Sequence, residues 1–546
     1  MTEQRANTMS TLPRPALAGI MVLCLIGVVL VQGYLNEQRG RMNPTYVEPL
    51  SDAPPMLALT TEALGGFRGI ISTYLWLRSN EMQLKKNYPE QMQLGEWITQ
   101  LQPDVPQAWA NRSWNLAYNI SREYPEPEMR WKYIQSAIRI LRDEGIRYNP
   151  DEPLIYHQIA YTFQHKIGHN LDDHHRYYKH RWMGEMIKAL WSDPVASNQS
   201  QGVPDFDALI SPQTEEEKAR AEIVREVYGL DPREMRAVHQ RYGWALDHEG
   251  KIIRDEEGKP INCLDWRMAE THALYWSYLG LKRCSHTPGR EKELHKLEKT
   301  IYVSMMYNFQ RGKLSPYAGV MIDPAAFFSG RFMSVPNLES AGAVHQTYLE
   351  IINLAQDSRE LHYTEGTSEI GHIHFLRRVI QWLYFYNREE EARNWLETAV
   401  KLYPKKMSWF PGYDKETDTY RLDDIVMSNL KDDMERGGDT KTQALLSGVL
   451  TKHLFYRADG EEEQADQYLS MAIQVYDHYA DKFKKAGDRM SMGTFEEVMY
   501  FNTHRFLTLE PPAVTSALRR ELGLGPDEFP KRPGVPEGPQ LPPEGQ

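Results

Sequence analysis

The sequence has few cysteines. Three occur in 546 residues, and Cys24 lies inside an apolar N-terminal run, which leaves Cys263 and Cys284 for the rest of the chain. Between these two we expect one helix, Trp266 to Leu281, of about 16 residues, which at 1.5 Å per residue is about 24 Å long. A disulfide needs Cα atoms within about 7 Å of each other. The sequence therefore predicts two free thiols, and cysteine pairing gives no guide to the compartment.

The chain also lacks an excess of positive charge, and its formal net charge is -12. Such a chain repels phosphate backbones, so we expect no nucleic-acid partner. The sequence contains no GxxxxGK[ST] phosphate loop and no GxSxG, HExxH, CxxC or CxxCH motif. Nucleotide hydrolysis, serine-ester hydrolysis, zincin chemistry, thiol redox chemistry and covalent haem binding therefore lack their usual signatures. We predict no catalytic residue and no bound cofactor from these motifs.

Charged residues are missing from one long run near the N-terminus. Pro15 to Val31 reads PALAGIMVLCLIGVVLV, and with the next four residues it reaches roughly the 20 residues that span a bilayer. A buried core helix would show a polar stripe, and a cleaved signal peptide would end in small residues spaced A-x-A, unlike Gln32-Gly33-Tyr34-Leu35. The run therefore favours a transmembrane helix at 15–35, with a cleaved signal peptide as the main alternative.

The direction of this helix is less clear from charge. Arg5 and Arg14 precede the run, while Arg39 and Arg41 follow it, so the positive-inside count is nearly balanced. A short N-terminal tail and a large C-terminal body suit a signal anchor. We therefore expect the body to lie outside the cytoplasm.

Beyond this run the pattern of apolar residues predicts an all-α protein. Apolar and aromatic residues recur at three-to-four spacing from Phe67 onward, and prolines separate the helices. Thr214 and Glu217 form a predicted capping box, and Asp231-Pro232 should start a helix that stops at Gly243. The text HEGKIIRDEEGKPINC, ending at Cys263, predicts a small β-hairpin or an irregular excursion instead.

We therefore expect an all-α fold with an organisation that follows the chain. Its parts are a short tail at 1–14, a transmembrane helix at 15–35, a link at 36–66, helix-pair repeats at 67–200, an insertion with helices and a possible β-hairpin at 201–262, further helix pairs at 263–510, and a proline-rich, mostly disordered tail at 511–546.

One repeat is clearer than the others. The text HFLRRVIQWLYFYNREEEARNWLETAVKLYP ends at Pro404 and resembles a tetratricopeptide repeat. In that family the first helix carries large apolar residues, the second carries small residues where the helices touch, and a proline follows. Here the matching positions are Leu376, Val379 and Leu383, then Ala392, Leu396 and Ala399. Small residues permit close helix axes, and proline cannot continue a helix.

A second, weaker copy follows, with Asp477 in place of the final proline. Its matching positions are Val449, Tyr456, Ala465, Leu469 and Ala472. This resemblance implies a tetratricopeptide-like (TPR-like) α-solenoid. The whole chain also resembles a set of uncharacterised bacterial membrane-anchored proteins that carry the patterns GGFRG … LWLR, WNLAYNIS, RDEGIRYNP, FQHKIG and DWR..ETHALYW. That resemblance supports the expected architecture, a membrane anchor followed by a helical body, and carries no assigned activity.

The segment HKIGHNLDDHHRYYKH is the main candidate for metal binding. His165 and His169 would share one helix face, a spacing at which two imidazoles can hold one divalent transition metal, with Asp172 and His174 completing the site. The favoured alternative is a polar loop whose histidines cap a helix or pair with acids. Gly168 weakens the helix there, and no Glu separates the two histidines as a zinc hydrolase requires.

Two further histidine-containing segments are weaker candidates. Glu270 and His272 lie two residues apart in DWRMAETHALYW and so point to different sides of a helix, which favours a helix core over a catalytic pair. His372 and His374 precede the clearest repeat, and we expect them to be its N-terminal polar residues rather than ligands.

Four aromatic residues could line a concave groove for a peptide or a partner helix. They are Trp109, Trp114, Tyr118 and Trp131. The alternative is that they form the core between helices, as aromatic stripes usually do.

The leading hypothesis is a non-enzymatic scaffold that is anchored in the bacterial inner membrane and binds other membrane or envelope proteins. The alternative is an all-helical metal- or carboxylate-dependent enzyme that uses the His165 to His180 region. It requires at least three of those side chains to converge in a pocket. A lipid- or glycan-binding module, which would need a deep apolar groove, is a third possibility.

Overall fold

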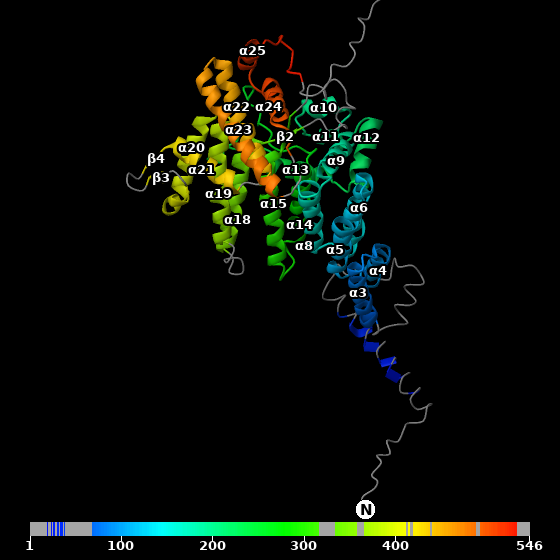
Figure 1. Ribbon diagram of the computed structural model, residues 1–546. Coiled ribbons are helices and arrows are strands. Elements are labelled where there is room, and N and C mark those ends of the chain that lie inside the picture. The colour runs from blue at the N-terminus through cyan, green and yellow to red at the C-terminus, as the bar shows by residue number, and fades with distance from the viewer. Residues whose placement is uncertain are drawn as a thin grey trace, which may run out of the picture. The chain divides into compact units, whose positions relative to one another are not determined.

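The computed structural model describes residues 68–315, 333–357, 365–410, 413–414, 419–436, 439–486 and 492–531, together with scattered positions between 19 and 38. Helices dominate this part of the chain (Figure 1). The predicted tail at 1–14, most of the predicted transmembrane helix at 15–35 and nearly all of the predicted link at 36–66 lie outside the described residues. Among the helices that are described, none is both long and apolar enough to cross a membrane.

The chain divides into two compact units. One consists of Met1–Ile159 with Arg283–Thr287, and the other of Ala160–Lys282 with Pro288–Gln546. The helices of the first unit are α3 (Arg68–Leu84), α4 (Tyr88–Leu101), α5 (Pro106–Trp114), η2 (Asn115–Ile120), η3 (Ser121–Glu123), α6 (Pro127–Arg139), η4 (Ile140–Gly145), α7 (Ile146–Tyr148) and the start of α8 (Pro153–Tyr161).

Proline starts these helices as the sequence predicts. Pro106 and Pro127 are the first residues of α5 and α6, where proline's fixed φ suits a helix and its missing N–H costs nothing. Helix α4 ends at Leu101, before Pro103, as the expectation that prolines separate the helices predicts. Leu75 and Met82 of α3 and Leu94 and Ile98 of α4 form one buried cluster, which holds α3 and α4 together.

The second unit begins with the helices around the insertion, and the last two residues of α14, Arg283 and Cys284, belong to the first unit. These helices are η5 (Thr162–Ile167), α9 (His175–Leu190), α10 (Pro194–Gln199), α11 (Phe206–Ile210), α12 (Glu215–Glu222), η6 (Ile223–Val227), α13 (Pro232–Tyr242), α14 (Ala269–Cys284) and α15 (Glu291–Arg311). The capping box of Thr214 and Glu217 and the helix that stops at Gly243 are both confirmed. Three antiparallel bridges between Trp244 and Asn262 confirm the predicted β excursion.

The helix predicted between the cysteines starts three residues later than expected. Asp265 binds the backbone N–H of Arg267 at 2.9 Å, and its carbonyl accepts from the N–H of Met268, so this stretch is a turn. The helix α14 then has 16 residues, from Ala269 to Cys284. Cys263 and Cys284 are free and buried, which confirms that prediction.

The rest of the second unit is built from longer helices and two small strand pairs. Strands β1 (Lys313–Ser315) and β2 (Met333–Val335) pair antiparallel, as do β3 (Tyr413–Asp414) and β4 (Thr419–Tyr420). The helices are η7 (Leu338–Ser340), α18 (Ala341–Asp357), α19 (Glu365–Phe385), α20 (Glu389–Leu402), η9 (Pro404–Trp409), α21 (Leu422–Arg436), α22 (Asp439–Asp459), α23 (Glu462–Ala486), α24 (Phe495–Leu509) and α25 (Pro512–Glu521).

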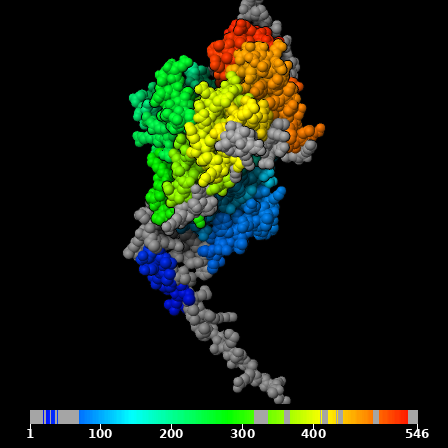
Figure 2. Space-filling view, turned by 90° about the vertical axis from the view of Figure 1, so that its left-hand side faces the viewer, coloured from blue at the N-terminus to red at the C-terminus, as the bar shows by residue number. Residues whose placement is uncertain are grey.

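Helix pairs form where the two repeats were identified. Helix α19 packs on α20, and α22 packs on α23. The small residues Ala392, Ala399, Ala465 and Ala472 are fully buried, which fits their expected place at the helix contacts. In Figure 2 the helices from α20 to α23, coloured yellow to orange, adjoin one another on the face shown.

The predicted C-terminal tail needs one correction. The stretch 511–546 was expected to be mostly disordered, but Pro512–Glu521 forms α25. Leu518 of this helix is fully buried against Leu454, Phe506 and Leu507, so a few apolar residues are enough to hold it. The most proline-dense part of the tail, beyond residue 531, lies outside the described residues.

Candidate functional site

The candidate ligands of the histidine-rich segment make other contacts in the structure. The rings of His165 and His169 lie 5.9 Å apart between centroids, but η5 ends before Gly168, so the two do not share one regular helix. Asp172 instead accepts from the Lys166 ammonium at 2.7 Å and from the Tyr178 hydroxyl at 3.0 Å. Within the part of the chain that is described, no three His, Cys, Asp or Glu side chains are placed to hold a metal.

His174 lies at the start of α9, where its backbone N–H donates to the Asp172 carboxylate at 3.0 Å. The chemistry of the segment is therefore that of a buried ion pair. Burial raises the pKa of Asp172, but its bonds with Lys166 bring that pKa below its usual range. Burial and the nearby Arg311 lower the pKa of His169 to about 4, so this imidazole is neutral at physiological pH.

A second buried ion pair lies beside this segment and was not foreseen from the sequence. The Arg311 Nε donates to Glu270 Oε1 at 2.8 Å, and the two side chains are 4% and 2% exposed. Gly168 is required for this arrangement, because a Cβ there would lie 2.9 Å from Glu270 Oε1. Glu270 thus has a structural partner, and His272 is fully buried with its Nε2 2.9 Å from the Trp266 carbonyl oxygen.

The four candidate aromatic residues do not share one exposed surface. Trp109 and Trp131 are each 2% exposed, and the Trp109 Nε1 donates to the Pro103 carbonyl at 2.8 Å. Trp114 is 39% exposed and stacks on the half-buried Tyr118, with 4.1 Å between ring centroids. Of the four, Trp114 and Tyr118 are therefore the two that keep a substantial part of their surface exposed.

His372 and His374 lie in the interior of α19 rather than at its N-terminus. His372 is fully buried, and its ring bonds the ring of His345 at 2.8 Å and the Tyr403 hydroxyl at 2.7 Å. His374, two residues further along α19, is exposed. The expectation that both are terminal polar residues is wrong, because α19 begins at Glu365, nine residues before the clearest repeat.

His374 lines a polar pocket of about 280 Å³ in the second unit. The pocket lies between three helices that contact one another, α19, α21 and α22. Its lining residues are His374, Arg377, Arg378 and Gln381 from α19, Asn429 and Asp433 from α21, and Lys441 from α22. Three of these side chains are cationic and one is a carboxylate, so positive charge exceeds negative charge in the pocket.

Hydrogen bonds fix one side of this pocket. Arg377 donates through Nε and Nη2 to Asn429 Oδ1 at 2.9 and 2.8 Å. Oriented by its hydrogen bonds, the Gln381 amide donates to Asp433 Oδ2 at 2.9 Å and accepts from the Leu430 N–H at 3.0 Å. The Asn429 Nδ2 is buried and meets no acceptor among the described residues. It is a donor without an acceptor in the wall of the pocket.

The remaining two cations, Arg378 and Lys441, repel each other. The positive charge of Arg378, together with burial, lowers the pKa of Lys441. Burial lowers the pKa of Arg378 as well, and the Asp433 carboxylate opposes this shift only in part. A negative group in the pocket would relieve both effects, because it would attract the two charges that now repel.

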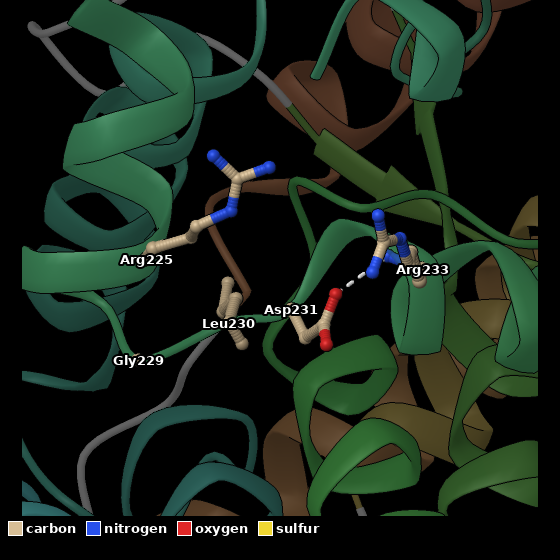
Figure 3. A pocket seen from close by; sticks show the side chains of 5 residues that line it. All are labelled: Arg225, Gly229, Leu230, Asp231 and Arg233. Carbon is tan, nitrogen blue, oxygen red and sulfur yellow. Dashed lines mark hydrogen bonds between the residues drawn. The ribbon is translucent and has the colours of Figure 1, made fainter. Parts of the chain in front are cut away.

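A second hollow, of about 420 Å³, lies where η6 leads into α13. Figure 3 shows Arg225 and Arg233 on opposite sides of it, with Leu230 and Asp231 between them. Arg225 donates to the Leu209 carbonyl at 2.9 Å, and the Asp231 carboxylate caps α13 by accepting from the Arg233 N–H at 2.9 Å. These two hydrogen bonds hold the connection between η6 and α13 in place. We therefore assign Arg225 and Asp231 a structural role.

The pocket between α19, α21 and α22 was not predicted. The clearest repeat contains only the lining residues that come from α19. The cationic pair Arg377-Arg378 is visible in the sequence, but Asn429 and Lys441 are more than 50 residues away. Comparisons of the chain with protein-family models, with curated proteins and with solved structures give no match.

Proposed function

We propose that this chain is a membrane-anchored, TPR-like scaffold of the bacterial cell envelope that binds partner proteins and catalyses no reaction. The observation that carries the proposal is the cation-lined pocket between α19, α21 and α22, set among packed helix pairs. The pocket holds an acidic group of the partner, either a side-chain carboxylate or a chain terminus.

The helix pairs support a binding role. Stacked helix pairs expose extended surfaces, and repeat proteins use such surfaces to bind other chains. The second helix of each pair, α20 and α23, carries fully buried alanines, and Pro404 follows the first pair, as in a tetratricopeptide repeat. The pocket opens where helices of both pairs meet α21.

The pocket supplies the chemistry for an acidic group. Lys441 and Arg378 provide positive charge, and the Asn429 Nδ2 provides a buried donor that lacks an acceptor among the described residues. A hydrogen bond to a charged group contributes about 1.5–3 kcal/mol, so one carboxylate with two such bonds would anchor a peptide segment. An apolar group at this position would leave the Asn429 donor unpaired.

The apolar run at 15–35 supports the location. We place the protein in the inner membrane as a single-pass chain with its body outside the cytoplasm, where partners would be other membrane or envelope proteins. Anchoring confines the body to a thin layer, which raises the effective concentration of membrane-bound partners.

The first experiment is a pull-down of the detergent-solubilised, full-length protein from its native membranes, with proteins and metals in the eluate identified by mass spectrometry. Stoichiometric recovery of a membrane or envelope protein supports the scaffold. Recovery of the chain alone with near-equimolar transition metal, lost on replacing His165 and His169, would sink it in favour of a metal enzyme.

A charge-neutralising variant tests the pocket itself. Lys441→Gln should weaken capture of the partner about tenfold or more, because one charge-assisted hydrogen bond of at least about 1.4 kcal/mol is lost. Lys405→Gln is the matched control, since it removes the same charge from an exposed position outside the pocket. Equal capture by both variants, with both folded by circular dichroism, would remove the pocket from the proposal.

A further inference from the structure

Helix α3, the first helix of the described body, is apolar on two opposite faces. One face packs against α4 and carries Leu75 and Met82, which are 7% and 2% exposed. The other face is open. Its large side chains are Ile70, Tyr74, Leu77 and Leu84, which are 66%, 63%, 66% and 86% exposed.

These four residues form one stripe. Their spacings of four, three and seven residues keep them on the same side of an α-helix, because 3.6 residues make one turn. A helix on the surface of a soluble domain carries polar residues on its outer face. The outer face of α3 instead resembles a second buried face, which calls for an apolar surface to cover it.

Charged groups lie only along the C-terminal half of the stripe, and the one within it, Glu81, is paired. Glu81 lies between Leu77 and Leu84, and its carboxylate accepts from the Lys85 ammonium at 2.6 Å and from Arg78 at 3.0 Å. Lys85 and Lys86 are exposed at the end of the helix. A Tyr within an aliphatic stripe, with lysines at its edge, is the composition of a helix that lies at a membrane surface.

We propose that this stripe, Ile70, Tyr74, Leu77 and Leu84, lies in the boundary between headgroups and acyl chains of the membrane that anchors the protein. The inference rests on the proposed anchor at 15–35. Helix α3 is the first described helix after that run and is joined to it by the link at 36–66, so the bilayer is the apolar surface that the chain itself brings near the stripe.

The contact would fix the orientation of the first unit relative to the membrane. A tether at one point alone leaves the body free to turn, whereas a helix bound along its length holds one side of the first unit against the lipid. Because the anchor raises the local concentration of lipid around α3, a stripe of four residues is enough for a lasting contact.

Site-directed fluorescence in reconstituted vesicles tests this. In full-length protein carrying Cys24→Ser, the other two cysteines are buried, so an added cysteine takes a fluorescent label alone. Leu77→Cys places the label on the stripe. Gln83→Cys places it at another exposed position of the same helix, about 120° away around the axis. The vesicles contain phosphatidylcholine and phosphatidylglycerol with a nitroxide on the upper acyl chain.

We expect the nitroxide lipid to quench the label at position 77 at least threefold more strongly than the label at position 83. Vesicle flotation is measured on the same samples. Protein that does not float has no anchor, and both proposals fail. Protein that floats with equal quenching at the two positions keeps its anchor and refutes the stripe contact.

Two other results would also refute the lipid contact, and each would identify what covers the stripe instead. Both show a label at position 77 that is shielded from aqueous iodide but not quenched by the nitroxide lipid. Shielding that grows with protein concentration indicates a second copy of the chain. Shielding that is independent of concentration indicates another segment of the same chain.

Discussion

The buried ion pair of Glu270 and Arg311 allows a quantitative prediction. Glu270→Gln keeps the size of the side chain and removes its charge. The Arg311 guanidinium then stays 4% exposed with no compensating carboxylate, since its Nη1 and Nη2 have no partner among the described residues. Breaking a buried pair by removing one charge costs about 3–5 kcal/mol, and we expect a loss of this size in the free energy of unfolding.

A neighbouring cation adds to the expected loss. Burial and the positive charge of Arg311 already lower the pKa of Lys179 well below its usual value, and Glu270 opposes that effect. Once the Glu270 charge is gone, the repulsion between Lys179 and Arg311 is no longer offset. The Glu270 carboxylate therefore stabilises the charge of Lys179 as well as that of Arg311.

The assay is urea unfolding of the full-length protein, followed by tryptophan fluorescence, with hydrogen exchange of peptides from α14 and α15 as a local measure. Glu216→Gln is the control, because the Glu216–Arg220 pair has a 68% exposed carboxylate and exposed pairs contribute at most about 1 kcal/mol. A loss for Glu270→Gln that matches the control would refute the electrostatic account. Replacing both partners, Glu270→Leu with Arg311→Met, should restore most of the stability.

Two further predictions concern packing and pH. Gly448→Ala should cost about 1–3 kcal/mol in thermal unfolding, because its Cβ would lie 2.8 Å from Tyr386 Cε2, whereas Gly366→Ala has open space and should be neutral or slightly stabilising. Burial lowers the pKa of His272 to about 4, below the unfolded value of about 6.5. The unfolded chain therefore binds the proton first, and stability should fall as pH drops from about 6.5 to 4, by up to about 3 kcal/mol for this residue. Urea midpoints across that range check this, and a flat profile, or one unchanged by His272→Gln, would contradict it.

Helix boundaries were the most predictable part of the fold. The capping box at Thr214, the helix from Pro232 to the residue before Gly243 and the stop before Pro103 all depend on local backbone chemistry, which neighbouring residues determine. The burial of Ala392 and Ala399 was also predictable, because small residues at helix contacts recur at fixed spacing in such repeats.

Local patterns failed where distant contacts decide the outcome. The 511–546 stretch looked mostly disordered, yet Leu518 packs into a core with Phe506, Leu507 and the more distant Leu454. His372 looked like a terminal polar residue, yet the ring of His345 and the hydroxyl of Tyr403 satisfy both of its ring nitrogens inside the protein.

The amino-acid sequence by itself determined that this chain is helical, where many helices start and stop, and that its cysteines do not pair, because these properties follow from neighbouring residues. Only the tertiary structure decided which charges are buried together and which face of α3 stays open. Glu270 and Arg311, or Arg378 and Lys441, are separated by tens of residues, and their meeting depends on how helices pack. The candidate pocket belongs to this second class, since no local pattern brings α19, α21 and α22 to one place.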